Sequence, residues 1–282
     1  MLSAGTSSLD PKSKRIFSLA PHRAVVTTSW DDDHSSSLQV AELLSAAKLP
    51  GTFYVPTGRL GEGSVLGATD LRSLSAAGFE VGAHTVSHRI LTNLSVQEQA
   101  REITECKQTL QQILGREVTT FCYPRGRFDA AVVRQVKRAG YHGARGTRML
   151  HCGREFDPFE IPTTVQAYPH RRSNYVRNLV RLRAFPALLT SIPDLVQFSG
   201  WERLGKKMFD RVLRNGGIWH LYGHPWEIGK LNLWSQLREM LDYVSDRAEV
   251  TYANNGRLLD LASAGHHAET EDVAQARHGM VL

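Results

Sequence analysis

Short apolar segments alternate with longer amphipathic segments along most of this chain. Such alternation is typical of repeated βα units arranged around a mostly parallel sheet. The chain has 282 residues, of which 41% are hydrophobic, so it is long enough for one large core, and a single α/β barrel of this length is ordinary. The pattern therefore predicts one α/β domain.

The alternation predicts where the elements lie. Strands are expected at 24–29, 51–55, 79–83, 119–122, 143–145 and 217–222. Helices are expected at 36–47, 71–77, 95–114, 130–139 and 234–244. The clearest helix has Ser95 as its N-cap, with Glu98 completing a capping box.

Three segments interrupt or flank this pattern. Residues 1–23 form an N-terminal extension, 24–264 the main domain, and 265–282 a polar tail that we expect to be disordered. Residues 170–214 form a basic, helical insertion. Its basic side chains are Arg171, Arg172, Arg177, Arg181, Arg183, Arg203, Lys206, Lys207, Arg211 and Arg214, against Asp194, Glu202 and Asp210.

The charge of the insertion allows two interpretations. The net charge of the chain is +6, and a basic segment could attract an anionic surface such as a phosphate-linked glycan or a membrane. A solvated helical face is the plainer interpretation. No nucleic-acid motif accompanies the segment, so no nucleic-acid partner is expected.

The ends of the chain and its cysteines bear on its location. The first twenty residues show no basic stretch followed by an apolar one, and no segment is long and apolar enough to span a bilayer. The cysteines, Cys106, Cys122 and Cys152, have no metal-binding spacing and do not suggest a disulfide framework. We therefore expect a soluble, cytoplasmic protein without a transmembrane segment.

Polar residues follow several predicted strands directly. They are the Asp31–Asp33 triplet, His84, the segment 123–125 and His224. Because the C-terminal ends of parallel strands share one rim, these residues are expected to meet at one site.

One carboxylate and two histidines are the ligand set of an open catalytic zinc site. The aspartate triplet with His84 and His88 could supply this set, and a second carboxylate beside the first could then serve as a base. The spacing of four residues would place both histidines on one face of a helical turn.

These motifs resemble those of a known family. Ser29-Trp30-Asp31-Asp32 is similar to the Thr-Phe-Asp-Asp motif of the polysaccharide deacetylases, the NodB-like carbohydrate esterase 4 group. The segment 84–88, His-Thr-Val-Ser-His, resembles their His-Ser/Thr-x-x-His motif. The resemblance continues through 121–126 and a late strand ending at His224, and it implies a distorted (β/α) barrel with about seven parallel strands.

The resemblance implies roles for the first two motifs. Asp32, His84 and His88 would bind a divalent metal, most simply Zn²⁺, with Co²⁺ or Ni²⁺ as alternatives. By resemblance, Asp31 would be the base. It would not also bind the metal well, because adjacent residues of an extended strand point to opposite sides. Asp33 is read as a solvated turn residue or a cap of the helix that follows.

The third motif departs from the family pattern. Many members have Arg-x-Pro-Tyr, whose arginine orients the base, but Cys122 stands at the arginine's position and Arg125 at the tyrosine's. The backbone N–H of Arg125 would be the oxyanion donor. Arg127 and Arg145 are both candidates for orienting Asp31, and Cys122 is read as a small buried residue.

The late strand supplies the proposed acid. By resemblance, a histidine there protonates the leaving amine; His224 is preferred over His220 because it stands at the strand's C-terminal end. The acidic partner of this histidine is left open among Asp157, Glu160 and Glu227.

Aromatic residues near the motifs could line a sugar subsite. The candidates for substrate binding are Tyr123, Pro124, Tyr222 and Trp226. For each aromatic side chain, core packing is the alternative.

The resemblance implies a metal-dependent hydrolase that removes N-acetyl groups from an amino-sugar oligosaccharide, glycan or glycolipid precursor. One alternative is a cyclic amide or imide hydrolase of the same fold, similar to allantoinase. Another is a glycan-binding relative without catalytic activity.

Overall fold

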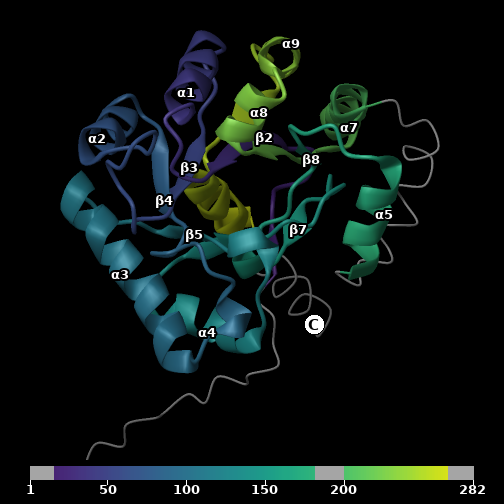
Figure 1. The fold of residues 1–282 in the computed structure, drawn as a ribbon. Helices are drawn as coiled ribbons and strands as arrows, with labels where there is room; N and C mark the ends of the chain where they lie inside the picture. The colour runs from purple at the N-terminus through teal and green to yellow at the C-terminus, as the bar shows by residue number, and fades with distance from the viewer. Residues whose placement is uncertain (1–15, 182–199, 266–282) are drawn as a thin grey trace, which may run out of the picture.

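The computed structural model describes residues 16–181 and 200–265, and a parallel sheet lies at its centre (Figure 1). Neighbouring strands follow the order β6-β5-β4-β3-β2-β9-β8, and β10 also pairs with β2. The strands are β2 (Ala24–Asp31), β3 (Thr52–Val55), β4 (Glu80–Ala83), β5 (Thr120–Cys122), β6 (Gly143–Arg145), β8 (Val165–Gln166), β9 (Gly217–Gly223) and β10 (Val250–Tyr252). The predicted α/β fold with about seven parallel strands is confirmed.

The sheet is curled, as in a distorted barrel. A parallel bridge joins Arg145, at the end of β6, to Ile161 in the segment that leads into β8. Since β6 and β8 are the two ends of the strand order, this bridge ties one end of the sheet to the other.

Helices surround the outside of the sheet (Figure 1). They include α1 (Ser37–Ala46), α2 (Ala68–Ala76), α3 (Val96–Leu114), α4 (Ala130–Arg138), α7 (Trp201–Asn215), α8 (Pro225–Lys230) and α9 (Trp234–Val244). Every residue of β2 and β9 is buried, as expected for parallel strands that are covered on both faces.

The helix over 96–114 begins as its sequence predicts. The Ser95 hydroxyl accepts a hydrogen bond from the Glu98 amide at 3.3 Å, and the Glu98 carboxylate accepts one from the Ser95 amide at 3.0 Å. Both interactions together form the expected capping box. The helix ends at Gly115, whose φ of +65° favours glycine.

Several short elements were not predicted. β1 (Phe17–Ser18) pairs antiparallel with β7 (Glu155–Phe156), and β10 lies beside the first half of β2. Strands of two or three residues are too short to show a hydrophobic period. The extension therefore contributes a strand to the fold from residue 17 onward.

The basic insertion contains α5 (Arg172–Arg181) and most of α7. Residues 182–199 of the insertion, 1–15 of the extension and 266–282 of the tail lie outside the described residues. Within 16–181 and 200–265, no helix combines the length and the apolar character needed to cross a bilayer.

A polar cluster fixes the N-terminal ends of three strands. Glu80 accepts hydrogen bonds from the hydroxyls of Thr52 at 2.7 Å and Thr120 at 2.8 Å, and from the Gly256 amide at 2.9 Å. These residues stand at the first positions of β4, β3 and β5 and in the final helical segment. Because every donor is matched, the cluster has a structural role, and the reactive residues gather at the opposite rim.

Candidate active site

The C-terminal ends of the central strands bring the predicted residues together. Asp31 is the last residue of β2, Cys122 of β5 and Arg145 of β6. His84 and His224 come directly after β4 and β9. The prediction that strand ends share one rim is met by this arrangement.

Asp31 is held by Arg145. The Arg145 guanidinium donates a hydrogen bond to Asp31 Oδ2, and the side chains are 0% and 6% exposed. The guanidinium lies 5.5 Å from the Tyr54 ring centre and 4.9 Å from that of Tyr222, so cation–π contacts add to the ion pair. Of the two candidate arginines, Arg145 is the one that contacts Asp31, whereas Arg127 is exposed.

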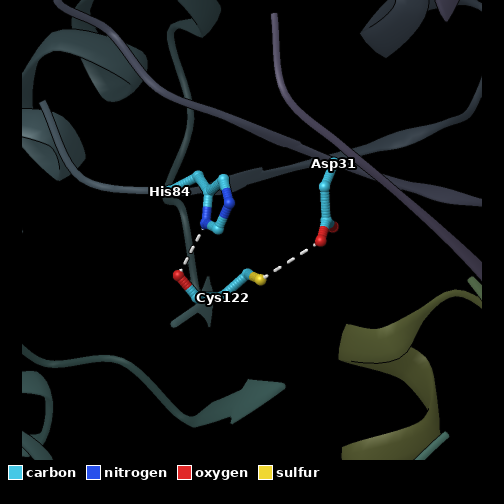
Figure 2. Close-up of side chains that lie close together, drawn as sticks. All are labelled: Asp31, His84 and Cys122. Atoms are coloured by element: carbon cyan, nitrogen blue, oxygen red, sulfur yellow. Dashed lines mark hydrogen bonds between the residues drawn. The ribbon is translucent and has the colours of Figure 1, made fainter. Parts of the chain in front are cut away.

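Cys122 explains how an arginine from another strand reaches Asp31. Cys122 and Arg145 are register partners on β5 and β6. The thiol lies 2.9 Å from Arg145 Nη2. It also lies 3.8 Å from Asp31 Oδ2 (Figure 2). Its small side chain leaves space for the neighbouring guanidinium.

The charges of this cluster follow from burial and pairing. Burial alone would raise the pKa of Asp31, but Arg145, with His84 and His224, outweighs burial and lowers that pKa to about 2. Burial raises the pKa of the Cys122 thiol well above its usual value. Asp31 is therefore ionised at neutral pH, and Cys122 is a neutral thiol.

Asp32 has different surroundings from Asp31. Its φ of +78° lies in the left-handed region and turns the chain at the end of the strand. One carboxylate oxygen accepts a hydrogen bond from Trp226 Nε1 at 2.8 Å, and the other lies 3.5 Å from His88 Nε2. The two aspartates thus face different partners.

His84 is oriented by the backbone of β5. Its Nδ1 lies 2.8 Å from the Cys122 carbonyl oxygen (Figure 2). Because a carbonyl oxygen only accepts hydrogen bonds, Nδ1 carries the proton, and Nε2 of the neutral ring is left as a lone pair. Such a backbone contact is the usual support of a metal-binding histidine.

The expected helical turn between His84 and His88 is wrong. Thr85 and His88 have positive φ values of 69° and 56°, and the segment is a loop. Glu102 of α3 accepts hydrogen bonds from the amides of Val86 at 2.9 Å and Ser87 at 2.8 Å. These hydrogen bonds fix the backbone of the loop. The two imidazole rings still come within 4.7 Å of each other, centre to centre.

Among the residues that the structure describes, two sets of side chains could offer three ligand atoms within 4.8 Å of one another. They are Asp32 with His84 and His88, and Asp31 with His84 and Cys122. In the second set, Asp31 is paired with Arg145, and Cys122 is a thiol, whereas the thiolate is the ligand form. In the first set, Asp32 Oδ1 and His88 Nε2 lie 3.5 Å apart, and the Cys122 carbonyl oxygen orients the His84 ring. The donor set of Asp32, His84 and His88 therefore fits a divalent metal.

His224 forms the opposite side of the site. Its Nδ1 lies 2.7 Å from Glu227 Oε2, and its Nε2 lies 3.9 Å from Asp31 Oδ2. Burial lowers the pKa of His224, but the Glu227 hydrogen bond and the nearby aspartates outweigh it, so the net pKa is raised. Of the three candidate acids, Glu227 is the one in contact with His224.

His220 belongs to the core. It is buried, with Nε2 2.8 Å from Ser29 Oγ and Nδ1 2.8 Å from the Pro162 carbonyl. Burial lowers its pKa to about 3, so it stays neutral. The strand-end position that favours His224 over His220 is thus the one that opens onto the cavity.

A cavity of about 400 Å³ collects these groups. Its lining residues are Asp31, His84, His88, Arg125, Gly126, Thr147, Met149, Gln166, His170, Asn174, Arg177, Asn178, Tyr222 and His224. A second hollow of about 580 Å³ shares His88 with the first and includes Asp32, Asp33 and Trp226. The candidate metal ligands therefore stand between two open spaces.

The predicted sugar-binding residues divide into two groups. Tyr222 lines the first cavity, and Trp226, which is 38% exposed, lines the second. Tyr123 and Pro124 are buried and line neither; the Tyr123 hydroxyl donates to the Phe159 carbonyl at 3.0 Å. Core packing therefore accounts for Tyr123 and Pro124.

Arg125 also lines the first cavity, with a φ of +55°. Asp33 is buried and lies 3.9 Å from Arg59. The helix cap expected of Asp33 is absent: α1 begins at Ser37 after Ser36, without a side-chain cap.

The sequence interpretation missed Gln166. It ends β8 and donates a hydrogen bond to Glu227 at 3.3 Å, while its carbonyl oxygen accepts from Tyr222 and from His170, both at 2.7 Å. The strand-end rule that identified the other residues also applies to Gln166, because it is the last residue of β8.

Residues 19–144 match the family model described as polysaccharide deacetylase. The match covers less than half of the chain, and this part is similar to the polysaccharide deacetylases. Among curated proteins it is similar to YxkH of Bacillus subtilis, with 22% identity over 49% of this chain and 50% of that protein.

Two further relatives carry names for an activity. The peptidoglycan-N-acetylmuramic acid deacetylase PdaC of Bacillus subtilis is 29% identical over 42% of this chain and 25% of its own length. A peptidoglycan-N-acetylglucosamine deacetylase of Bacillus cereus is 25% identical over 47% of this chain and 61% of its own length. The chain therefore spans less than two thirds of each of these relatives.

Solved structures agree with the deacetylase fold. A Mycobacterium smegmatis protein assigned to the polysaccharide deacetylases superposes with a TM-score of 0.58 and 15% identity over 89% of this chain and 96% of its own. A carbohydrate esterase 4 pseudoenzyme from Bacillus anthracis superposes with a TM-score of 0.51 and 17% identity over 86% and 67%. At these identities, the likeness is one of fold.

The contact between Arg145 and Asp31 generates a stability prediction. Arg145→Cys should lower the free energy of unfolding by about 3–5 kcal/mol at neutral pH, because it leaves a buried carboxylate unpaired. The difference should shrink as pH falls from about 4 toward 2, since the depressed pKa of Asp31 means that the pair's contribution is lost there. Urea unfolding at several pH values measures both effects.

Two matched variants complete this test. The exchange Cys122→Arg with Arg145→Cys should recover much of the loss, because it returns the guanidinium to the family's motif position. Arg127→Leu, at the other candidate arginine, should change stability by less than about 0.5 kcal/mol. Equal losses for Arg127→Leu and Arg145→Cys would show that Arg145 has no special role.

Proposed function

We propose that this chain is a metal-dependent hydrolase that removes N-acetyl groups from an amino sugar in a glycan or a glycolipid precursor. The observation that carries the proposal is the separation of two adjacent aspartates. Asp31 is ionised and paired with Arg145, while Asp32 faces His88 beside His84. A base and a metal ligand side by side are what hydrolysis by activated water requires.

The named relatives support an N-acetylated sugar as the substrate class. Two of them are peptidoglycan deacetylases, one acting on N-acetylmuramic acid and one on N-acetylglucosamine. We extend this class to the present chain on the basis of the family match and the residues at the rim.

Asp32, His84 and His88 would hold the ion, with Zn²⁺ as the first choice and Co²⁺ or Ni²⁺ as alternatives. When bound, such an ion lowers the pKa of a neighbouring water and polarises the acetyl carbonyl. His84 is prepared for this role because its Nδ1 proton is held by the Cys122 carbonyl.

The other side chains would move the protons. Asp31 takes a proton from the attacking water, and Arg145 keeps its carboxylate in place. The Arg125 amide donates a hydrogen bond to the oxygen that becomes negatively charged. His224 gives its proton to the departing amine, so that acetate and a free amino sugar are formed.

Glu227 positions His224 for this transfer. Its carboxylate fixes Nδ1, which directs Nε2 toward Asp31 and the cavity. Tyr222 and Trp226 offer aromatic faces in the two hollows, where pyranose rings could pack.

Two features favour catalysis by this site over its alternatives. A binding protein without activity has no need of the base and the acid, yet both Asp31 and His224 are present and face the same cavity. An allantoinase-like enzyme tends to lose part of the metal set, which this chain retains.

The three cysteines are free thiols, which fits a reducing compartment such as the cytoplasm.

The direct test is acetate release from N-acetylated chitooligosaccharides and peptidoglycan fragments by the zinc-loaded protein. Asp31→Asn should lower the rate by about 100-fold or more, because it removes the general base, while zinc content stays stoichiometric. Asp33→Asn, the neighbouring aspartate, should retain most of the activity. Unchanged acetate release by Asp31→Asn would contradict the mechanism.

The pH profile tests the role of Glu227. The hydrogen bond from His224 to Glu227 raises the pKa of His224, and a general acid loses activity as pH rises through its pKa. Glu227→Gln should therefore move the alkaline limb of the kcat profile to lower pH. A limb at the same pH in wild type and variant would mean that His224 is not the acid or that Glu227 does not tune it.

A further inference from the structure

Two arginines, Arg125 and Arg177, line the first cavity together with the proposed catalytic residues. We propose that Arg177 and Arg125 bind an acidic group, a carboxylate or a phosphate, on the N-acetylated sugar. The acidic group would lie away from the acetyl group that is removed. This inference rests on the proposed function and names the class of substrate that the site prefers.

The charges around the cavity support an anionic occupant. Asp31 is the single acidic residue among its lining residues, and its charge is matched by Arg145. Arg125 and Arg177 line the cavity, and both are exposed. Within the part of the chain that the structure describes, the side chain of neither forms an ion pair or a hydrogen bond. A neutral sugar would leave both guanidinium groups without a protein or ligand partner.

The two arginines belong to segments that meet at Thr147. Gly126, next to Arg125, packs so closely on Thr147 that an added Cβ would lie 2.1 Å from Thr147 Oγ1. The Asn178 side chain, next to Arg177, donates a hydrogen bond to the Thr147 carbonyl at 2.8 Å. Each arginine is therefore next in sequence to a residue that contacts Thr147, and Thr147 also lines the cavity.

Helix α5 is built into this wall. Asn178 is 9% exposed, and its side-chain oxygen also accepts a hydrogen bond from the Met149 amide at 3.1 Å. Tyr175 and Leu179, on the same helix, are fully buried. Because these contacts fix the backbone of α5, Arg177 is held at the cavity at a lower entropic cost than an arginine on a free helix.

The same helix is connected to the catalytic side of the cavity. Asn174 lies 3.2 Å from His170 Nδ1, and His170 Nε2 lies 2.7 Å from Gln166, which in turn contacts Glu227. An acidic group bound at Arg177 would thus lie in the same cavity as His224. A series of hydrogen bonds connects the two sides of this cavity. That placement suits a substituent on the sugar ring that carries the acetyl group or on its immediate neighbour.

Arginine suits this task because its planar guanidinium forms paired hydrogen bonds with carboxylate and phosphate oxygens. The shared chemistry does not depend on which acid is present. A carboxylate on a lactyl ether and a phosphate on a sugar oxygen are the two sources that the experiment compares.

Equilibrium binding tests the inference independently of turnover. The ligands are N-acetylglucosamine, N-acetylglucosamine 1-phosphate and N-acetylmuramic acid, titrated by calorimetry into the full chain. At least one acidic sugar should bind about tenfold more tightly than the neutral sugar, and high salt should weaken that preference. The tighter of the two acidic ligands distinguishes phosphate from carboxylate.

The test variant and its control each remove one positive charge from α5. Arg177→Gln should reduce the preference for the acidic sugar to less than about threefold, whereas Arg172→Gln, which removes a charge from α5 outside the cavity lining, should leave it unchanged. Equal binding of all three ligands to the wild type would overturn the inference, and so would equal losses in the two variants.

Acetate release from the same three sugars separates this inference from the proposed function. Acetate release without an Arg177-dependent preference would support the proposed hydrolase and contradict the acidic subsite. Arg177-dependent binding of an acidic sugar without acetate release would support the acidic subsite and contradict the proposed hydrolase.

Discussion

The buried ion pair between Asp31 and Arg145 is the interaction on which the site depends. An aspartate at the end of the central strand is buried almost completely, and without a partner it would take up a proton or destabilise the fold. Arg145 keeps the carboxylate charged and fixes its direction. The rings of Tyr54 and Tyr222 pack against the guanidinium. The small side chain of Cys122, on the neighbouring strand, leaves space for the guanidinium.

This pair also decides what Asp32 can do. Once Asp31 is committed to Arg145, the next carboxylate is the one available to face His84 and His88. The positive φ of Asp32 turns the chain where the strand ends. One short sequence therefore supplies two chemically different carboxylates, and the difference arises from the partners that the neighbouring strands provide.

Much of this could be predicted from the sequence because the signals are local. The strands that lead to Asp31 and His84, and the capping box at Ser95, are each encoded by adjacent residues. The arginine partner was left open because strand register, which places Arg145 opposite Cys122, is a tertiary property. The loop between His84 and His88 could not be foreseen for the same reason, since Glu102 of a distant helix shapes it.

The central claim is that Asp32, His84 and His88 hold the metal while Asp31 and Cys122 stay with Arg145. X-ray absorption at the zinc edge of the zinc-loaded protein tests it most directly, because sulfur ligands lie at about 2.3 Å and nitrogen or oxygen ligands at about 2.0–2.2 Å. The account predicts a shell of nitrogen and oxygen only, with two imidazoles. A sulfur ligand at about 2.3 Å would place zinc at Cys122 and contradict the division of roles between the two aspartates.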